Sequence, residues 1–197
     1  MEGIKMVHQR HPAREMAYCG LFAALIATGA FIRITIPVQP FPMHFTFQFF
    51  FVLLAGFLLG ARQGALSVCL YLAVGLVGVP VFAAGGGPGY MIRPTFGFLL
   101  GFVAAAYITG RLAGHRDRPS FVWCLFSASC GMMAYYAAGM IYFYGISNYV
   151  LGMPVTWKLV FINCFLITAV EDFVLCLMAS MLAVRLKPAF RHMKGGF

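Results

Sequence analysis

The chain has 197 residues, of which 62% are hydrophobic and only 10% are charged. Soluble domains carry about 25% charged residues, so this composition argues against a soluble enzyme and predicts an integral membrane protein. A formal net charge of +9 would suggest nucleic-acid binding in a soluble protein. Here the basic residues lie in short segments between apolar runs, which favours a role in membrane orientation and predicts no nucleic-acid partner.

Six apolar runs predict one membrane domain over residues 1–197, with an all-α fold of six transmembrane helices. The predicted spans are 17–36, 45–60, 64–82, 95–112, 120–144 and 158–184. Pro37, Pro40 and Pro42 exclude a helix between the first two spans. The last run would rise about 40 Å as one helix, more than the roughly 30 Å hydrocarbon core, so it either tilts or breaks.

The distribution of charge predicts the orientation of the bundle. Six spans place both termini on the same side of the membrane. Of the 14 Lys and Arg residues, all but Arg33, Arg93 and Lys158 fall on that side. The positive-inside rule therefore predicts a cell-membrane protein with cytoplasmic termini and an external loop between the third and fourth spans.

That external loop is rich in glycine. It contains Gly85, Gly86, Gly87, Pro88 and Gly89. Glycine and proline disfavour a regular helix, and irregular backbone at membrane depth is tolerated only where protein covers it or where it lines a cavity. The loop is either a plain exposed connector or a binding element in which Gly86, Gly87 and the following Tyr90 approach a ligand. Tyr90 also fits an interfacial aromatic belt.

Ionisable groups inside a membrane are costly, so each one is a candidate for function. Glu171 and Asp172 lie within the last apolar run. Asp172 can accept hydrogen bonds from a ligand, or it can pair with Lys158 or Arg93 as a structural ion pair. Arg93 can bind a carboxylate through two hydrogen bonds, or it can extend to the membrane interface.

The remaining polar residues in the apolar runs fit two roles each. Gln48 and Asn163 are single amides that could bond between helices or contact a ligand. Small residues four apart, such as Ala23 with Ala27, Gly56 with Gly60 and Gly97 with Gly101, let helices approach closely within the bundle or against another protein.

No catalytic signature is present in the sequence. The phosphate-binding loop G-x-x-x-x-G-K-[ST], the zinc motif H-E-x-x-H and the nucleophile motif G-x-S-x-G are all absent. We expect no catalytic residues, no metal and no cofactor. These residues predict a small membrane bundle with an external polar pocket and no energy source of its own.

Part of the chain resembles BioY, the biotin-specific S component of energy-coupling-factor (ECF) transporters. The matching segments are FVLLAGFLLG (51–60), LAVGLVGVPVF (72–82), GGGPGY (85–90) and PTFGFLLGF (94–102), and a looser similarity continues over residues 17–187. The resemblance implies six membrane helices with cytoplasmic termini and a substrate pocket closed by external loops. It also implies a transmembrane coupling subunit and two ATPase subunits as partners, which would supply the energy for high-affinity biotin uptake.

The resemblance also implies roles for single residues. The family usually reads P-G-D at the start of its last helix, with a lysine three residues later; here Val170-Glu171-Asp172 and Leu175 stand at those places. Asp172 would accept hydrogen bonds from the two ureido N–H groups of biotin, and this alignment favours a helix break near Ala169. Arg93 is the candidate for the ligand carboxylate.

Further roles follow from the same similarity. Gln48 and the loop glycines would contact the ligand, and Ala23 with Ala27 match the family's A-x-x-x-A motif, which meets the coupling subunit. Three alternatives remain at this point: an S component for another small carboxylate such as lipoate, a self-contained proton-coupled carrier, and an intramembrane enzyme.

Overall fold

A computed structural model describes residues 12–37, 43–114 and 119–195. Its elements, in chain order, are α1 (Pro12–Phe31), β1 (Arg33–Ile36), β2 (Met43–Thr46), α2 (Gln48–Leu59), α3 (Ala61–Leu76), the 3-10 turn η1 (Pro88–Ile92), α4 (Phe96–Gly114), α5 (Phe121–Gly145), the π-helical turn η2 (Ile146–Val150), α6 (Trp157–Phe161), the π-helical turn η3 (Ile162–Leu166) and α7 (Ala169–Gly195).

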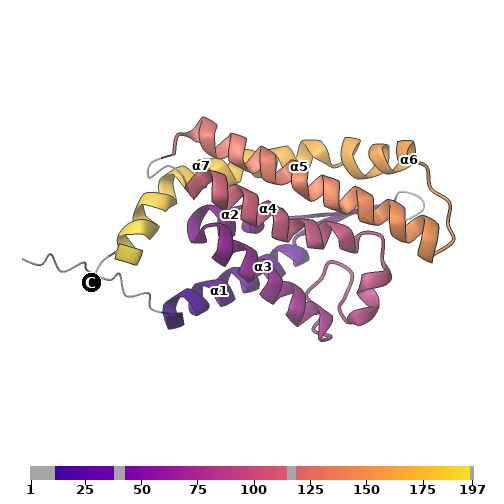
Figure 1. Ribbon diagram of the computed structural model, residues 1–197, viewed down its shortest axis with the longest axis horizontal. Coiled ribbons are helices and arrows are strands. Elements are labelled where there is room, and N and C mark those ends of the chain that lie inside the picture. Colours follow the sequence, from indigo (N-terminus) through magenta and orange to yellow (C-terminus); the bar gives the residue numbers. More distant parts are fainter. Residues whose placement is uncertain (1–11, 38–42, 115–118, 196–197) are drawn as a thin grey trace, which may run out of the picture.

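The helices form one bundle around a shared apolar core. In Figure 1, α4 and α5 run side by side, α7 lies against α5, and α1, α2 and α3 pack on the other side of α4. The start of α1 and the end of α7 lie at the same end of the bundle, where the rings of Tyr18 and Phe190 are 5.6 Å apart. The loop between α3 and α4 lies at the opposite end, together with α6.

Glycines allow the closest helix crossings. A Cβ on Gly56 of α2 would lie 2.6 Å from the carbonyl oxygen of Ala106 on α4, and a Cβ on Gly101 of α4 would lie 2.7 Å from the carbonyl oxygen of Tyr135 on α5. Gly97 likewise meets Tyr142. The predicted packing role of Gly56, Gly97 and Gly101 is therefore confirmed. Gly60 has a different role, because it turns the chain between α2 and α3 with a φ of +88°.

The first connection contains a β-hairpin in place of the ends of two predicted spans. The sequence predicts helix to residue 36, but α1 ends at Phe31 and residues 33–36 pair antiparallel with residues 43–46. β-Branched residues favour a strand, and Pro37 ends it because proline lacks an N–H donor. The second helix begins at Gln48, three residues later than predicted, and α3 ends at Leu76 rather than at residue 82.

The last apolar stretch changes its hydrogen bonding on the way. Thr156 caps α6 by accepting from the Leu159 amide. The π-helical turn η3 follows, with the Ile167 amide donating to the Ile162 carbonyl, and α7 begins at Ala169. The winding changes through η3, but α6 continues into α7 without a reversal of the chain (Figure 1), and residues Trp157–Phe190 form one helical segment rather than two helices with a break near residue 169. This places Glu171 and Asp172 in the first turn of α7.

Three of the described helical segments are long and apolar enough to cross a membrane, namely Phe96–Gly114, Phe121–Val150 and Trp157–Phe190. Two shorter apolar helices, Gln48–Leu59 and Ala61–Leu76, complete the bundle, and the first of them is buried over nearly its whole length. Many apolar side chains face outward, including Val122, Met133 and Leu166. A helical bundle with such a surface is a membrane architecture, because no other layer of the described part of the chain covers those side chains.

Candidate functional site

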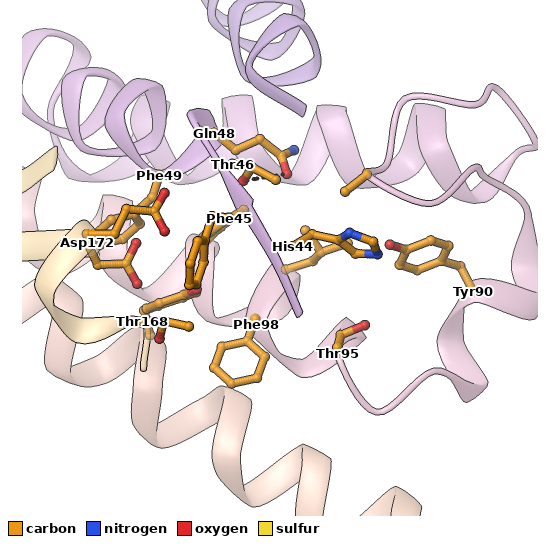
Figure 2. A pocket seen from close by; sticks show the side chains of 15 residues that line it. His44, Phe45, Thr46, Gln48, Phe49, Tyr90, Thr95, Phe98, Thr168 and Asp172 are labelled. Atoms are coloured by element: carbon orange, nitrogen blue, oxygen red, sulfur yellow. Dashed lines mark hydrogen bonds between the residues drawn. The ribbon is translucent and has the colours of Figure 1, made fainter. Parts of the chain in front are cut away.

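A cavity lies between β2 and helices α2, α4, α5 and α7. It is lined by His44, Phe45, Thr46, Gln48, Phe49, Ala83, Tyr90, Thr95, Phe98, Leu99, Phe102, Tyr135, Thr168, Glu171 and Asp172. Figure 2 shows Asp172 at one end and His44 facing Tyr90 at the other, with Phe45 between them. The walls are mainly aromatic and the polar groups lie towards the ends, an arrangement typical of small-molecule pockets.

The inner end of the cavity contains the acid that the sequence singled out. Asp172 is buried, with an exposed fraction of 6%. Its Oδ2 is hydrogen-bonded to the hydroxyl of Tyr136, which in turn lies 2.8 Å from Oγ1 of Thr168. Thr168 donates to the carbonyl oxygen of Cys164 at 2.7 Å. Neither the ion pair with Lys158 nor the one with Arg93 forms among the described residues.

Gln48 joins the cavity wall to the loop between α3 and α4. Its side-chain nitrogen donates to the Tyr71 hydroxyl at 2.6 Å, and its oxygen accepts from Thr46 at 3.3 Å. The Tyr71 hydroxyl also reaches the carbonyl oxygen of Val81 at 3.4 Å. Gln48 therefore bonds between α2 and α3, which is one of the two roles that the sequence left open. It also lines the cavity, and its contact with a ligand stays a prediction.

A second, outer cavity adjoins the first. It is lined by His44, Gly89, Ile92, Arg93, Pro94, Thr95 and Leu151. His44 and Thr95 line both cavities, so the two are neighbours. The outer cavity has a volume of about 420 Å³, whereas the inner one has about 70 Å³. Small-molecule sites measure roughly 300–1,000 Å³, so the outer cavity falls within that range and the inner one extends it towards Asp172.

The outer cavity carries the positive charge of the site. Arg93 is exposed, and its guanidinium lies over the ring of Tyr90. His44 is held by a 3.0 Å hydrogen bond between its Nδ1 and the Thr35 hydroxyl. Partial burial and the positive charges of Arg33 and Arg93 lower the pKa of His44 below its usual value. At neutral pH Arg93 is therefore the cation of this end of the site, and His44 is uncharged.

Several predicted site residues lie elsewhere. Gly86 and Gly87 pack against the end of α3, where the Gly87 amide donates to the Gly75 carbonyl at 2.7 Å, and neither lines the two cavities. Gly86 allows a tight approach within the loop and to the end of α3, since a Cβ on Gly86 would lie 2.3 Å from the Val79 oxygen and 3.1 Å from the Gly75 oxygen. Asn163 lies in η3 and lines neither of the two cavities.

The two residues of the predicted partner interface lie on the side of α1 that faces the bundle. Ala23 is buried in the core with an exposed fraction of 8%, and Ala27 is partly buried, so these two residues face neighbouring helices. The outward face of α1 instead presents small residues at Gly20, Ala24 and Thr28. A Cβ on Gly20 would meet no heavy atom within 4 Å.

Other residues at the site were not identified from the sequence. Tyr136 and Thr168 hold Asp172, and His44 joins the two cavities. Tyr136 lies in an apolar run beside a second tyrosine, and nothing in that run distinguishes the tyrosine that bonds to the acid from its neighbour. Only the pairing of α5 with α7 selects it.

Comparison with known proteins identifies the family of this chain. The sequence profile described as the BioY family matches residues 5–192. The chain belongs to the BioY family. It is 42% identical to a probable biotin transporter BioY of Lysinibacillus sphaericus over 87% of this chain and 85% of that protein. It is also 41% identical to the biotin transporter BioY of Thermotoga maritima over 64% of this chain and 72% of that protein.

The fold of this BioY-family protein matches a solved structure. The crystal structure of an S-component for biotin from an ECF-type ABC transporter superposes with a TM-score of 0.74 and 20% sequence identity, covering 89% of this chain and 92% of that one. Membership of the family confirms the predicted membrane bundle, and because the relatives are named as transporters it confirms a transport protein over an enzyme.

Proposed function

We propose that this protein is the substrate-binding S component of an ECF-type ABC transporter and that its ligand is biotin. The single observation that carries the assignment is the order of groups along the two cavities. A buried acid lies at the inner end, aromatic walls follow, and Arg93 lies at the outer end. Biotin has two ureido N–H donors at one end, an apolar ring and chain, and a carboxylate at the other end.

Each part of the ligand has a partner of matching chemistry. Oδ1 of Asp172, which makes no hydrogen bond among the described residues, is available to accept from a ureido N–H. Phe49, Phe98 and Tyr135 surround the apolar middle. Arg93 provides the planar donor pair that a carboxylate binds through two hydrogen bonds.

We also propose an orientation of the protein in the membrane and its partner subunits. Both ends of the described chain lie at the end of the bundle opposite the glycine-rich loop (Figure 1), and the excess of basic residues supports a cytoplasmic location for that end. A transmembrane coupling subunit would dock on the outward face of α1 at Gly20, Ala24 and Thr28, where small side chains permit close helix contact. Two ATPase subunits would supply the energy, and the bundle would tilt within the coupling subunit to carry the ligand inward.

A ligand titration on the purified protein tests the proposal. Biotin should bind tightly without being converted to any product. Lipoate shares the pentanoate tail but lacks the ureido group, so it should bind much more weakly. Tighter binding of lipoate would identify an S component for a different carboxylate. Uptake by this chain alone in proteoliposomes, driven by a pH gradient, would instead identify a self-contained carrier.

A further inference from the structure

The hydrogen bonds around Asp172 form a chain of three links. The carboxyl of Asp172 meets the Tyr136 hydroxyl, the Tyr136 hydroxyl meets the Thr168 hydroxyl, and the Thr168 hydroxyl meets the carbonyl oxygen of Cys164. Each link needs one proton between its two oxygens. A tyrosine and a threonine hydroxyl each have one proton to donate, and a carbonyl has none.

The protein hydroxyls supply too few protons to complete this chain of hydrogen bonds. Tyr136 and Thr168 together supply two protons for three links. If Asp172 is ionised, one pair of buried oxygens faces each other without a proton between them. If Asp172 is a carboxylic acid, it donates to Tyr136, Tyr136 donates to Thr168, and Thr168 donates to Cys164. Only the acid form places a proton in all three links, whereas the ionised form leaves the Tyr136 and Thr168 oxygens 2.8 Å apart with no proton between them.

The charges around the acid favour the same state. The titratable groups around Asp172 and its cavity among the described residues are Glu171 and Cys176 on α7, Tyr135 and Tyr136 on α5, Cys164 in η3 beside Tyr135 and, across the cavity, His44 on β2 and Tyr90 in η1. None of the fifteen residues that line the inner cavity is a lysine or an arginine. A second carboxylate, Glu171, lines the same space, and two adjacent carboxylates without a cation are costly inside a membrane.

The position of the acid in its helix opposes protonation. Glu171 and Asp172 lie in the first turn of α7, where the helix dipole favours negative charge. Here α6 and η3 continue into α7, and the amide of Asp172 is already bonded to the Thr168 carbonyl at 3.1 Å. The N–H groups that would carry the dipole's positive end are therefore partly satisfied within the chain.

We propose that the proton is a second ligand of this site: Asp172 is held as a carboxylic acid in the empty protein by Tyr136 and Thr168, and binding of the vitamin displaces its proton. The second half of this proposal rests on the proposed function, whereas the first half does not. Tyr136 and Thr168 are positioning residues, because they act on the ligand through Asp172.

On binding, Asp172 exchanges its proton for hydrogen bonds from the ligand. A ureido N–H needs an acceptor, and the ionised carboxylate offers both of its oxygens. When the ligand enters, the Asp172 O–H bond breaks and its proton leaves through the cavity past Glu171 to the external water. The Tyr136 hydroxyl then turns to donate to Oδ2 of Asp172, so its link to Thr168 loses its proton, and the donors of the ligand offset that loss. The carboxylate thus keeps one donor from the protein and gains donors from the ligand.

Infrared spectroscopy of the unliganded protein tests the first half directly. A protonated carboxyl has a C=O stretch that is resolved from the bands of a carboxylate. At neutral pH, the wild-type spectrum should contain this band, Asp172→Asn should lack it, and the matched control Glu171→Gln should keep it. Identical spectra for wild type and Asp172→Asn would overturn the proposal, as would loss of the band in Glu171→Gln alone.

Calorimetry tests the second half in the wild-type protein, which avoids any doubt about folding of a variant. Biotin is titrated at neutral pH in buffers that differ in their enthalpy of ionisation, and the slope of heat against that enthalpy counts protons. About one proton should be released per biotin, and the affinity should rise about tenfold per pH unit until the empty site is ionised. Tight binding with no proton released overturns the exchange. No binding of biotin at all contradicts the proposed function, and the infrared result then decides the protonation of Asp172 by itself.

Discussion

The guanidinium of Arg93 lies over the face of the Tyr90 ring, with Cζ 5.1 Å from the ring centroid. The ring itself is buried, because it packs 4.7 Å from Phe82 and 6.3 Å from Phe96, measured between ring centroids. A cation over an aromatic face gains about 0.5–1 kcal/mol at an exposed site. The 3-10 turn η1 therefore presents Arg93 from a fixed platform at the outer cavity.

This position predicts a carboxylate-specific effect of Arg93→Ala. Hydrogen bonds to charged groups contribute about 1.5–3 kcal/mol, so biotin should bind about 10- to 100-fold more weakly to the variant. Biotinamide, which has no carboxylate, should lose much less. The measurement is a paired titration of both ligands on wild type and variant. An equal loss for the two ligands would contradict the role of Arg93 as carboxylate partner.

At the inner end, Asp172→Asn should weaken biotin by about 100-fold or more. The amide places a donor where the ligand also has a donor, so one polar pair is left unsatisfied. Glu171→Gln is the matched control, because Glu171 lines the same cavity but makes no hydrogen bond among the described residues. Its effect on affinity should be much smaller. Wild-type affinity in Asp172→Asn would remove this acid from the site.

The hairpin should be sensitive to acid through His44. The pKa of His44 is lowered in the folded protein, so near its usual value the unfolded chain binds more protons than the folded one. Stability should therefore be undiminished above about pH 6.5 and should fall as the pH decreases below it. His44→Gln should remove that part of the pH dependence. Thermal unfolding of both proteins across this range is the measurement, and parallel curves would show that His44 contributes nothing.

Helix crossings should respond to one added methyl group. Gly56→Ala places a Cβ 2.6 Å from the Ala106 carbonyl oxygen, which forces α2 and α4 apart. Overpacking of this kind costs about 1–3 kcal/mol. Gly20→Ala, with no heavy atom within 4 Å of the new Cβ, is the control and should not destabilise the isolated protein. A lower unfolding temperature is expected only for Gly56→Ala, and equal values for the two variants would refute the crossing.

The outward face of α1 can be tested against a second lipid-facing position. Ala24→Trp should disrupt assembly with the coupling subunit while biotin binding by the isolated protein is retained. Met133→Trp is the control, because Met133 is exposed on a different helix, α5, and this variant should leave assembly intact. The measurement is co-purification of the complex from membranes. Normal assembly of Ala24→Trp would place the interface elsewhere.

The apolar runs were sufficient to predict the helices, because burial in lipid or protein imposes long uncharged segments. They could not predict where each helix stops. Residues 33–36 continue the first run without a charge after Arg33, yet they form a strand, since pairing with residues 43–46 satisfies their backbone. That partner lies beyond three prolines, and local propensity contains no information about it.

The residues of the candidate site were likewise predicted only in part. Asp172, Arg93, Gln48 and Tyr90 stand out as charged or polar residues in an apolar sequence, and the structure places them on the two neighbouring cavities. Gly86, Gly87, Asn163 and Ala23 fitted patterns that have more than one physical cause. Their neighbours depend on how the loop packs on α3 and how α1 rotates against the bundle.

The most direct measurement is a structure of this protein with biotin bound. We expect the ureido nitrogens to lie within hydrogen-bonding distance of the Asp172 carboxylate. The ring should lie between the aromatic walls, and the valerate carboxylate should contact Arg93. A ligand in the reverse orientation, or one bound outside these two cavities, would contradict this expectation.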